Sequence, residues 1–434
     1  MDGANYINTE ASDIIDMLGR AGYRAYIAGS CLCGLIMNKN VSEIDILTSA
    51  GIKEIKVLFP NSQNCGGYVS VNGNKVIFRL RQFKSRTDEN PDLNTDMARR
   101  DFTINAIACD NNSFTDMYGG RADIENKIIR CVGDAEKNLS EHPIRMLRAV
   151  RLACTLDFSL SEETSAAILK YARLLSCANQ NKIREELNKI LLSKKPEKII
   201  LLHKLGMLKY IMNEFEICFD TPQHNKYHIY NVGEHIVHTV KNTPDDLVLR
   251  WAALLHDIGK PDCISTDSSG TIHFYGHHKQ SAAIANNILY RLRFDSEFVE
   301  NVSVLIENHD VRIEPSLYGV KRMMARTGES LFEKLLSLQK ADAAAKNPDF
   351  LKEKEVKIEE VREIHKKILA ENHPYLVSHL LIGRKELMKA GIKRGRDVSD
   401  ILRVLLNEVI VNPKLNNGEY LIKEAKRLKN TLKF

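Results

Sequence analysis

Eight consecutive residues in the first quarter of the chain read Arg99-Arg100-Asp101-Phe102-Thr103-Ile104-Asn105-Ala106. Guanidinium groups donate paired hydrogen bonds to phosphate oxygens, so two adjacent arginines suit a phosphate-bearing ligand. Asp101 and Asn105 could orient the arginine pair and a ribose hydroxyl. The alternative is purely structural, an Arg-Asp cap on a buried helix. By the chemistry of its side chains alone, the stretch suits a phosphate-bearing ligand.

Two short motifs upstream point to the same chemistry. Gly29-Ser30 follows an apolar run, and Glu43 and Asp45 stand at the start of another. Side chains alternate along a strand, so these two carboxylates share one face. Such a pair is costly without a cation, and two-metal attack on a nucleoside triphosphate requires one. The Gly-Ser turn would let backbone N-H groups approach the phosphates. Acid-x-acid pairs are also common on ordinary solvent-facing strands, which is the alternative.

The eight-residue stretch resembles the RRDFTINA motif of the class II tRNA nucleotidyltransferases and their poly(A) polymerase relatives. The Gly-Ser pair followed by acid-x-Asp is similar to the polymerase-β-like nucleotidyltransferase superfamily. The resemblance implies an α+β fold, with a polymerase-β-like head followed by a helical neck, an HD domain and a helical tail. It also implies that Glu43 and Asp45 are catalytic and bind Mg²⁺. The residues that it implies contact the nucleotide are Gly29, Ser30, Arg99, Arg100, Asp101 and Asn105.

A second block, Glu141 to Arg151, resembles the neck motif EDxxRxxRxxR of the same family. Arg145, Arg148 and Arg151 recur at every third residue, which places them on one face of a helix. In the family, the Asp and the first Arg of this motif select CTP or ATP through the edge of the base. His142 stands at the Asp position here. The resemblance therefore implies that His142 and the three arginines bind the nucleotide.

The head departs from the family pattern at several positions. Cys33 and Gly34 replace the Arg and Asp of the first motif, and Glu43 replaces the first metal-binding Asp. Arg79 and Arg81 stand where relatives tend to have an acidic residue followed by Thr-Thr-Phe-Arg. Losing charged hydrogen bonds weakens the binding of the triphosphate and the choice of base together. We therefore expect a head that is slow, unselective or inactive.

A third motif lies farther along the chain, where the segment Leu254 to Lys260 reads LLHDIGK. With an earlier histidine and a later aspartate it resembles the HD metal-dependent phosphohydrolase superfamily. The metal ligands expected from this likeness are His235, His256, Asp257, His277 and Asp310. Imidazoles and carboxylates on neighbouring helices suit a divalent transition metal or Mg²⁺.

The HD motif implies a hydrolytic site with His256 and Asp257 at its centre. Water on a divalent metal loses its proton near neutral pH and could attack a phosphate ester or a 2',3'-cyclic phosphate. Lys260 could neutralise that phosphate. One histidine of the trio His277, His278 and His309 is expected to be structural only, and we favour His277 as the ligand.

Length and composition predict a multi-domain globular protein. A chain of 434 residues is too long for one core. We expect a head over residues 1–135, a neck over 136–221, an HD domain over 222–345 and a basic, RNA-binding tail over 346–434. The alternative for the tail is a solvated helical surface. No long apolar stretch or leader is evident, which favours a cytoplasmic protein with no membrane partner. The nine cysteines are expected to be reduced core residues.

Three functions remain open at this point. The first is template-independent addition of C or A from CTP or ATP to the 3' end of tRNA or another RNA. The second is a phosphohydrolase that uses the HD site and keeps a degenerate head as an RNA clamp. The third is a non-catalytic RNA-binding protein. The sequence leaves the oligomeric state open.

Overall fold

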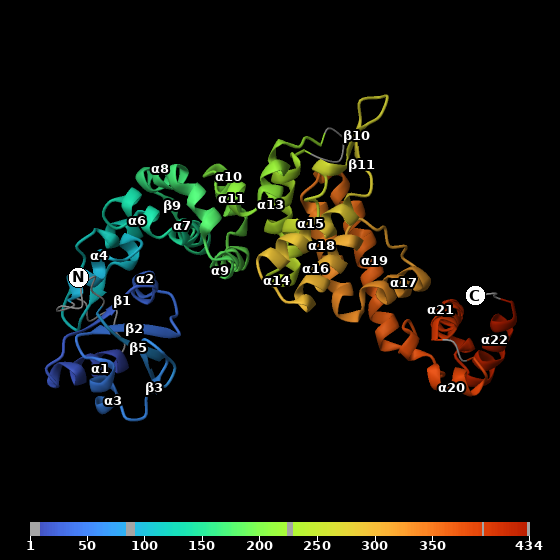
Figure 1. Cartoon of the computed structure of the whole chain (residues 1–434), viewed down its shortest axis with the longest axis horizontal. Coiled ribbons are helices and arrows are strands. Elements are labelled where there is room, and N and C mark those ends of the chain that lie inside the picture. The colour runs from blue at the N-terminus through green and yellow to red at the C-terminus, as the bar shows by residue number, and fades with distance from the viewer. Residues whose placement is uncertain (1–8, 84–91, 224–228, 393–394, 432–434) are drawn as a thin grey trace. The chain divides into compact units, whose positions relative to one another are not determined.

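The computed structural model describes residues 9–83, 92–223, 229–392 and 395–431. The chain forms two compact units, Met1–Ile211 and Met212–Phe434 (Figure 1). The first unit contains the main β-sheet, and the second is helical apart from a small hairpin.

The first unit begins with a head built on a seven-stranded sheet of order β3-β4-β5-β2-β1-β6-β7. The strands are β1 (Ala25–Ala28), β2 (Glu43–Thr48), β3 (Gln63–Asn64), β4 (Val69–Asn72), β5 (Ile77–Gln82), β6 (Ala108–Cys109) and β7 (Phe114–Thr115). β2 and β5 are parallel, with Asp45 opposite Arg79. The other neighbouring strands are antiparallel. This mixed sheet confirms the predicted α+β head.

Short helices complete the head: α1 (Thr9–Arg20), α2 (Ser30–Ile36), α3 (Ile52–Leu58), α4 (Leu93–Ala98) and α5 (Gly120–Glu125). A capping box starts α4, because the side chains of Asp92 and Thr95 each accept the other's backbone N-H. Gly29 precedes α2 with φ of 90°, a conformation that L side chains rarely adopt. A Cβ at Gly29 would also lie 3.0 Å from Arg100 Nη1, a tight contact that would force the arginine side chain to shift.

The rest of the first unit begins with β8 (Ile128–Ile129), still within the range expected for the head, and continues as the neck. The elements of the neck are α6 (Ala135–Glu141), α7 (Ile144–Leu156), β9 (Ser159–Leu160), α8 (Glu162–Tyr171), α9 (Gln180–Leu191), α10 (Ile200–Lys204) and α11 (Leu208–Ile211). Helix α7 packs on α9, and its buried residues include Leu147 and Val150. The neighbouring face of α7 carries the arginines at every third position, so the neck is helical as predicted.

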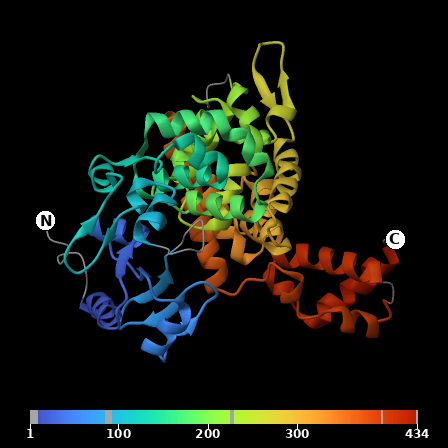
Figure 2. The ribbon, with the colours of Figure 1, turned by 60° about the vertical axis from the view of Figure 1, so that its left-hand side comes forward.

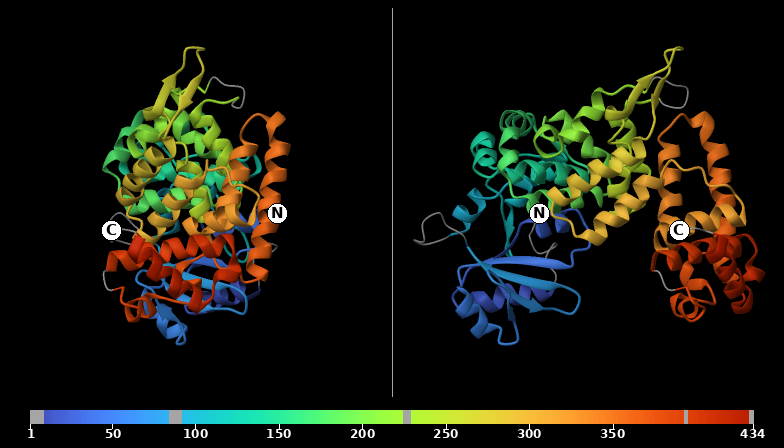
Figure 3. Two further views of the ribbon diagram at one scale, coloured as in Figure 1. Left: turned by 90° about the vertical axis from the view of Figure 1, so that its right-hand side faces the viewer. Right: turned by 45° about the vertical axis from the view of Figure 1, so that its right-hand side comes forward.

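The second unit opens with a helical bundle: α12 (Asn213–Glu216), α13 (Val232–Asn242), α14 (Leu247–Leu255), α15 (His277–Arg291), α16 (Ser296–Asn308), α17 (Leu317–Thr327) and α18 (Glu329–Ala344). Side-chain caps from Asn231, Asp246 and Asp295 start three of these helices. The hairpin of β10 (Ile264–Thr266) and β11 (Ile272–Phe274) stands out from the helices of its unit (Figures 2 and 3). A Cβ at Gly259 would lie 2.5 Å from the backbone nitrogen of Ser281, so the turn after α14 and helix α15 approach closely.

The C-terminal part of this unit contains α19 (Leu351–Ala370), α20 (Arg384–Lys389), α21 (Gly395–Val411) and α22 (Gly418–Thr431). Leu387, Ile401, Leu405 and Leu421 are at the centre of its own apolar cluster. Single 3₁₀ turns lie at Thr103–Asn105, Ala172–Cys177, Pro196–Ile199, Ile217–Asp220, Pro261–Cys263, Pro348–Phe350, Val377–His379 and Pro413–Leu415. Within the described residues, no helix is long and apolar enough to cross a membrane.

All nine cysteines are free, and six of them are buried as expected. The expectation of core positions is wrong for Cys65 and Cys177, which are exposed, and Cys263 is only half-buried.

Candidate functional site

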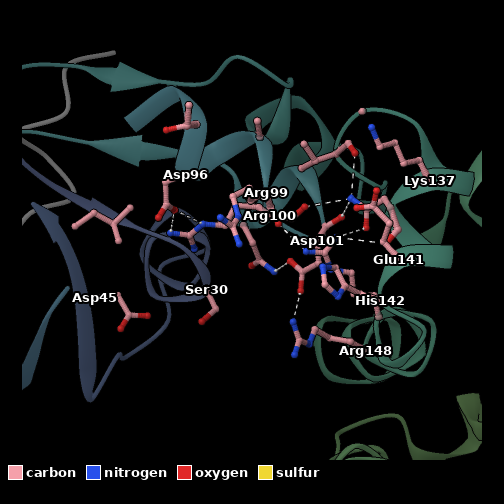
Figure 4. Close-up of a pocket in the computed structure, with 18 of the residues that line it drawn as sticks. Ser30, Asp45, Asp96, Arg99, Arg100, Asp101, Lys137, Glu141, His142 and Arg148 are labelled. Carbon is pink, nitrogen blue, oxygen red and sulfur yellow. Dashed lines mark hydrogen bonds and ion pairs between the residues drawn. The ribbon is translucent and has the colours of Figure 1, made fainter. Parts of the chain in front are cut away.

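A cavity of about 980 Å³ lies within the first unit (Figure 4). This volume suits a nucleotide-sized ligand. The predicted residues that line it are Ser30, Asp45, Arg99, Arg100, Asp101, Asn105, His142, Arg145, Arg148 and Arg151. In the close-up, Ser30 and Asp45 lie to one side, His142 lies to the other, and Arg99 and Arg100 lie between them. The predicted Gly29 and Glu43 do not line the cavity.

Asp101 is the buried anchor of the eight-residue stretch. Its carboxylate accepts hydrogen bonds from the Phe102 N-H at 2.9 Å, Asn105 Nδ2 at 3.0 Å and Arg148 Nη1 at 2.8 Å. Burial opposes ionisation, but the hydrogen bonds and charge of Arg148, helped by Asn105, hold the pKa of Asp101 below its ordinary value. Asp101 therefore stays charged and orients an arginine from α7.

The arginine pair itself is oriented differently from the expectation. Arg100 Nε lies 3.0 Å from Asp96 Oδ1, one turn earlier on the same segment, so Asp96 rather than Asp101 positions this guanidinium. Asp96 lies in the last turn of α4, and Arg100 directly follows the C-cap residue Arg99, so the two side chains meet where the helix ends. Arg99 is exposed and points its backbone carbonyl at Arg145 Nη2, 2.6 Å away.

The arginines of α7 are held by two residues that the sequence did not single out. Arg145 Nη1 donates to Asn138 Oδ1 at 2.8 Å, and Arg151 Nε lies 2.7 Å from Glu186 Oε2. Burial lowers the pKa of Arg145 from its ordinary value. Glu186 is itself buried on the apolar face of α9, between Ile183 and Ile190. An acid at an apolar position of an amphipathic helix is the sequence signal that would have revealed it.

His142 ends α6 as its C-cap residue and is exposed at the wall of the cavity. His142 precedes Arg145 by three residues, which is the spacing of the Asp and the first Arg in the neck motif. The structure therefore places both residues of the expected base-reading pair at the same cavity as Arg99 and Arg100.

The carboxylates of β2 are paired with arginines from β5. Arg79 Nε lies 2.9 Å from Asp45 Oδ1, and Arg79 Nη1 lies 2.8 Å from Glu43 Oε2. Arg81 Nη2 lies 3.5 Å from the other oxygen of Asp45. Oxygen ligands of this kind suit Mg²⁺. With the Arg79 guanidinium between them, however, Glu43 and Asp45 do not fit a divalent cation in this arrangement.

A second cluster, the His-Asp cluster, lies at the centre of the bundle in the second unit. Its members are His235, His256, Asp257, His277, His309 and Asp342, all less than a tenth exposed. Two overlapping sets have ligand atoms close enough to hold a metal ion: His235, His256 and Asp257, and Asp257, His277 and His309. Burial lowers the pKa of His256, which favours the neutral imidazole that metals bind.

Asp310 does not belong to this cluster, contrary to the sequence prediction. Its side chain is exposed just after α16, whereas the preceding His309 turns inward with Nε2 3.4 Å from His277 Nε2. The later carboxylate is Asp342 from α18, whose Oδ1 lies 3.1 Å from His235 Nε2. Asp342 follows Leu338 by one helical turn on the buried face of α18, which is the signal that could have identified it. His278 is half-buried and lies outside both metal-binding sets.

Lysines complete the His-Asp cluster. Lys260 Nζ lies 2.7 Å from Asp257 Oδ2 and 2.7 Å from Gln223 Oε1, so it faces the carboxylate within a buried site. Lys346 Nζ lies 2.7 Å from Asp342 Oδ2. The Oδ1 atoms of Asp257 and Asp342 are buried without a hydrogen-bond partner among the described residues. Orphaned carboxylate oxygens beside imidazole nitrogens fit a divalent cation.

Comparison with known proteins agrees with this geometry. Residues 25–130 match the family described as "Poly A polymerase head domain", residues 157–218 match "Probable RNA and SrmB- binding site of polymerase A", and residues 226–347 match "HD domain". These matches define a nucleotidyltransferase head followed by an HD domain.

Similar proteins of known activity identify the family of nucleotidyltransferases to which the chain belongs. The chain is 32% identical over 331 residues to the A-adding tRNA nucleotidyltransferase of Deinococcus radiodurans, covering 73% of this chain and 75% of that protein. It is 35% identical over 201 residues to the CCA-adding enzyme of Lactobacillus delbrueckii, covering 43% of this chain and about half, 51%, of that enzyme. The chain therefore belongs to the family of the tRNA nucleotidyltransferases, as its motifs implied.

The fold is also that of a solved relative. The CCA-adding enzyme of Bacillus stearothermophilus, solved in complex with CTP, superposes with a TM-score of 0.73 at 24% identity, over 97% of both chains.

Proposed function

We propose that this protein adds nucleotides to the 3' end of tRNA without a nucleic-acid template. The observation that carries the proposal is the cavity of about 980 Å³ lined by the arginines of residues 99–100 and by His142 and Arg145. Relatives in this family are A-adding and CCA-adding enzymes. The cavity thus combines phosphate-binding groups with the expected base-reading pair.

Each group in the cavity has a role in this proposal. Arg99 and Arg100 bind the triphosphate, and Asp101 with Asn105 fixes the position of Arg148 and meets the ribose. Arg145 donates to the base, and His142 offers one donor and one acceptor where an aspartate would offer acceptors only. Glu43 and Asp45 supply oxygen ligands suited to Mg²⁺ once Arg79 no longer pairs with them.

An incorporation assay tests the proposal. The substrates are tRNAs shortened stepwise at the 3' end by up to the whole CCA sequence, each mixed with labelled CTP or ATP in Mg²⁺ or Mn²⁺. Arg100→Ala should raise KM for the nucleotide by about ten- to a hundredfold, the worth of one or two charged hydrogen bonds. Arg121→Ala is the matched control, because Arg121 packs over the Phe114 ring and does not line the cavity. Absence of incorporation with every tRNA, nucleotide and metal rejects the proposal.

Different domains of the chain bind different parts of the substrates. The head over residues 1–135 and the neck over 136–221 bind the nucleotide, and the basic tail over 346–434 binds the body of the tRNA through its phosphates. The HD domain occupies residues 222–345. A tRNA substrate implies a cytoplasmic protein.

A second function is favoured by the orphaned oxygens of the His-Asp cluster. His235, His256, Asp257, His277, His309 and Asp342 would hold a divalent transition metal or Mg²⁺. A metal there would supply an activated water for attack on a phosphate ester such as a 2',3'-cyclic phosphate. Metal analysis of the purified protein and hydrolysis of 2',3'-cyclic AMP, each compared with His256→Ala, test it. Neither metal nor hydrolysis in the wild type would reject this second function.

A further inference from the structure

The strand beside the catalytic carboxylates carries two arginines where a metal site would need acids. Because β2 and β5 are parallel, the register sets Arg79 opposite Asp45 and Arg81 opposite Leu47. One guanidinium fork, that of Arg79, contacts both Asp45 and Glu43 at 2.9 and 2.8 Å. Glu43 and Asp45, which would share a divalent metal ion, therefore already share the positive charge of Arg79.

The local charge leaves little attraction for a metal. The two carboxylates are balanced by Arg79 and Arg81, and Asp45 is nearly buried, with 10% of its side chain exposed. Screening by water is therefore weak at Asp45, whereas Glu43, with 46% of its side chain exposed, is better screened. Mg²⁺ needs oxygen ligands at about 2.0 to 2.1 Å in near-octahedral geometry, and here it would meet oxygens that already accept from guanidinium groups.

Arg81 points to the ligand that would change this arrangement. It lines the cavity, and its Nε is buried without a hydrogen-bond partner among the described residues. That donor is available to an anion in the cavity. Phosphate oxygens accept the same paired hydrogen bonds as carboxylates, so a nucleoside triphosphate is the class of ligand able to draw Arg81 away from Asp45 and so loosen the cluster of charges that holds Arg79.

We propose that Arg79 is an internal cation that competes with the divalent metal for Glu43 and Asp45, so that the head takes up metal only when Arg79 leaves them. The proposal rests on the proposed nucleotidyltransferase function and adds regulation of its metal site. Without nucleotide, the wild-type head should bind Mn²⁺ weakly, and removing the guanidinium should create a tighter site.

Mn²⁺ titration of the full chain, read by electron paramagnetic resonance of the free ion, tests this without measuring activity. Arg79→Gln should gain one site that is at least tenfold tighter than any head site of the wild type. Adding Asp45→Asn to that variant should remove the site. Arg121→Gln should change nothing, because the Arg121 guanidinium packs over the Phe114 ring and does not bridge the carboxylates of β2. Binding at the His-Asp cluster is common to all these variants and cancels in the comparison.

Two results overturn the proposal. One is a tight Mn²⁺ site in the wild type that Asp45→Asn removes, and the other is a folded Arg79→Gln with no gain. If Arg79→Gln does not fold, the comparison of wild type with Asp45→Asn decides alone, and equal Mn²⁺ binding supports the proposal. Failure of nucleotide incorporation under all conditions would reject the proposed function, whereas this Mn²⁺ comparison would still give its own answer.

Discussion

At the scale of single residues, the cavity depends on charges that hold one another in place. Asp101 is buried between α4 and the 3₁₀ turn Thr103–Asn105, and its partner Arg148, whose side chain is 38% exposed, comes from α7. Removing one member of a buried pair leaves the other without compensation, which costs more than the pair contributes. The same logic applies to Asp96 with Arg100 and to Glu186 with Arg151.

Asp101→Asn should lower the free energy of unfolding of the first unit by about 1 to 3 kcal/mol at pH 7. The folded-state pKa of Asp101 lies below its ordinary value of 3.8. Its ionised form therefore adds stability above the unfolded pKa, and this contribution is lost as the pH falls through the lower folded pKa. Urea unfolding of both proteins between pH 7 and pH 3 should show a difference that is constant to about pH 4 and then shrinks. A difference that grows on acidification would contradict this account.

His142 should leave the choice of nucleotide loose. A histidine at the wall of the cavity cannot supply the two acceptors with which an aspartate reads an exocyclic amine. On a tRNA whose next position calls for one nucleotide only, discrimination is the kcat/KM for the correct nucleotide divided by that for the other. His142→Asp should therefore increase this discrimination between CTP and ATP by about tenfold, the worth of one charged hydrogen bond. Sharp discrimination in the wild type, unchanged by the substitution, would mean that another residue reads the base.

At the scale of elements, the second carboxylate of the His-Asp cluster comes from α18, and Asp310, just after α16, is not part of the cluster. Asp342 faces His235 and His256, whereas Asp310 is exposed. If the cluster holds a metal, Asp342→Asn should lower the metal content at least tenfold, and Asp310→Asn should leave it unchanged. Mass spectrometry of the metals in the purified proteins gives the answer. Loss of metal from Asp310→Asn but not from Asp342→Asn would show that Asp310 is the ligand, as the sequence predicted.

The sequence predicted what local spacing encodes and failed where distant helices meet. The arginines of α7 share a face because of their spacing, and the residues of the stretch 99–106 that were expected to bind nucleotide line the cavity. Asp342 and Glu186 were missed, because only packing between helices far apart in sequence brings them to a site. Arg79 was seen as a departure from the family pattern, but its contact with both carboxylates required the parallel register of β2 and β5.

At the scale of the whole molecule, the basic tail should supply much of the affinity for tRNA. Lys385, Lys389, Lys423 and Lys426 are exposed on α20 and α22. Because each neutralised phosphate releases counterions, the logarithm of the affinity should fall linearly with the logarithm of salt concentration. Replacing all four by glutamine should make that slope shallower by about 0.7 to 0.9 for each phosphate that is no longer neutralised. Lys53→Gln, an exposed lysine of α3, is the control. An unchanged slope would show that the tail is only a solvated surface.

The central claim is that the cavity of the first unit transfers nucleotides, independently of the His-Asp cluster. Incorporation of labelled ATP and CTP into tRNA lacking its terminal residues should be measured for three proteins: wild type, Asp45→Asn and His256→Ala. We predict incorporation by the wild type and by His256→Ala at comparable rates, and a loss of at least a hundredfold in Asp45→Asn. Loss in His256→Ala with retention in Asp45→Asn, or no incorporation by any of the three, would contradict the account.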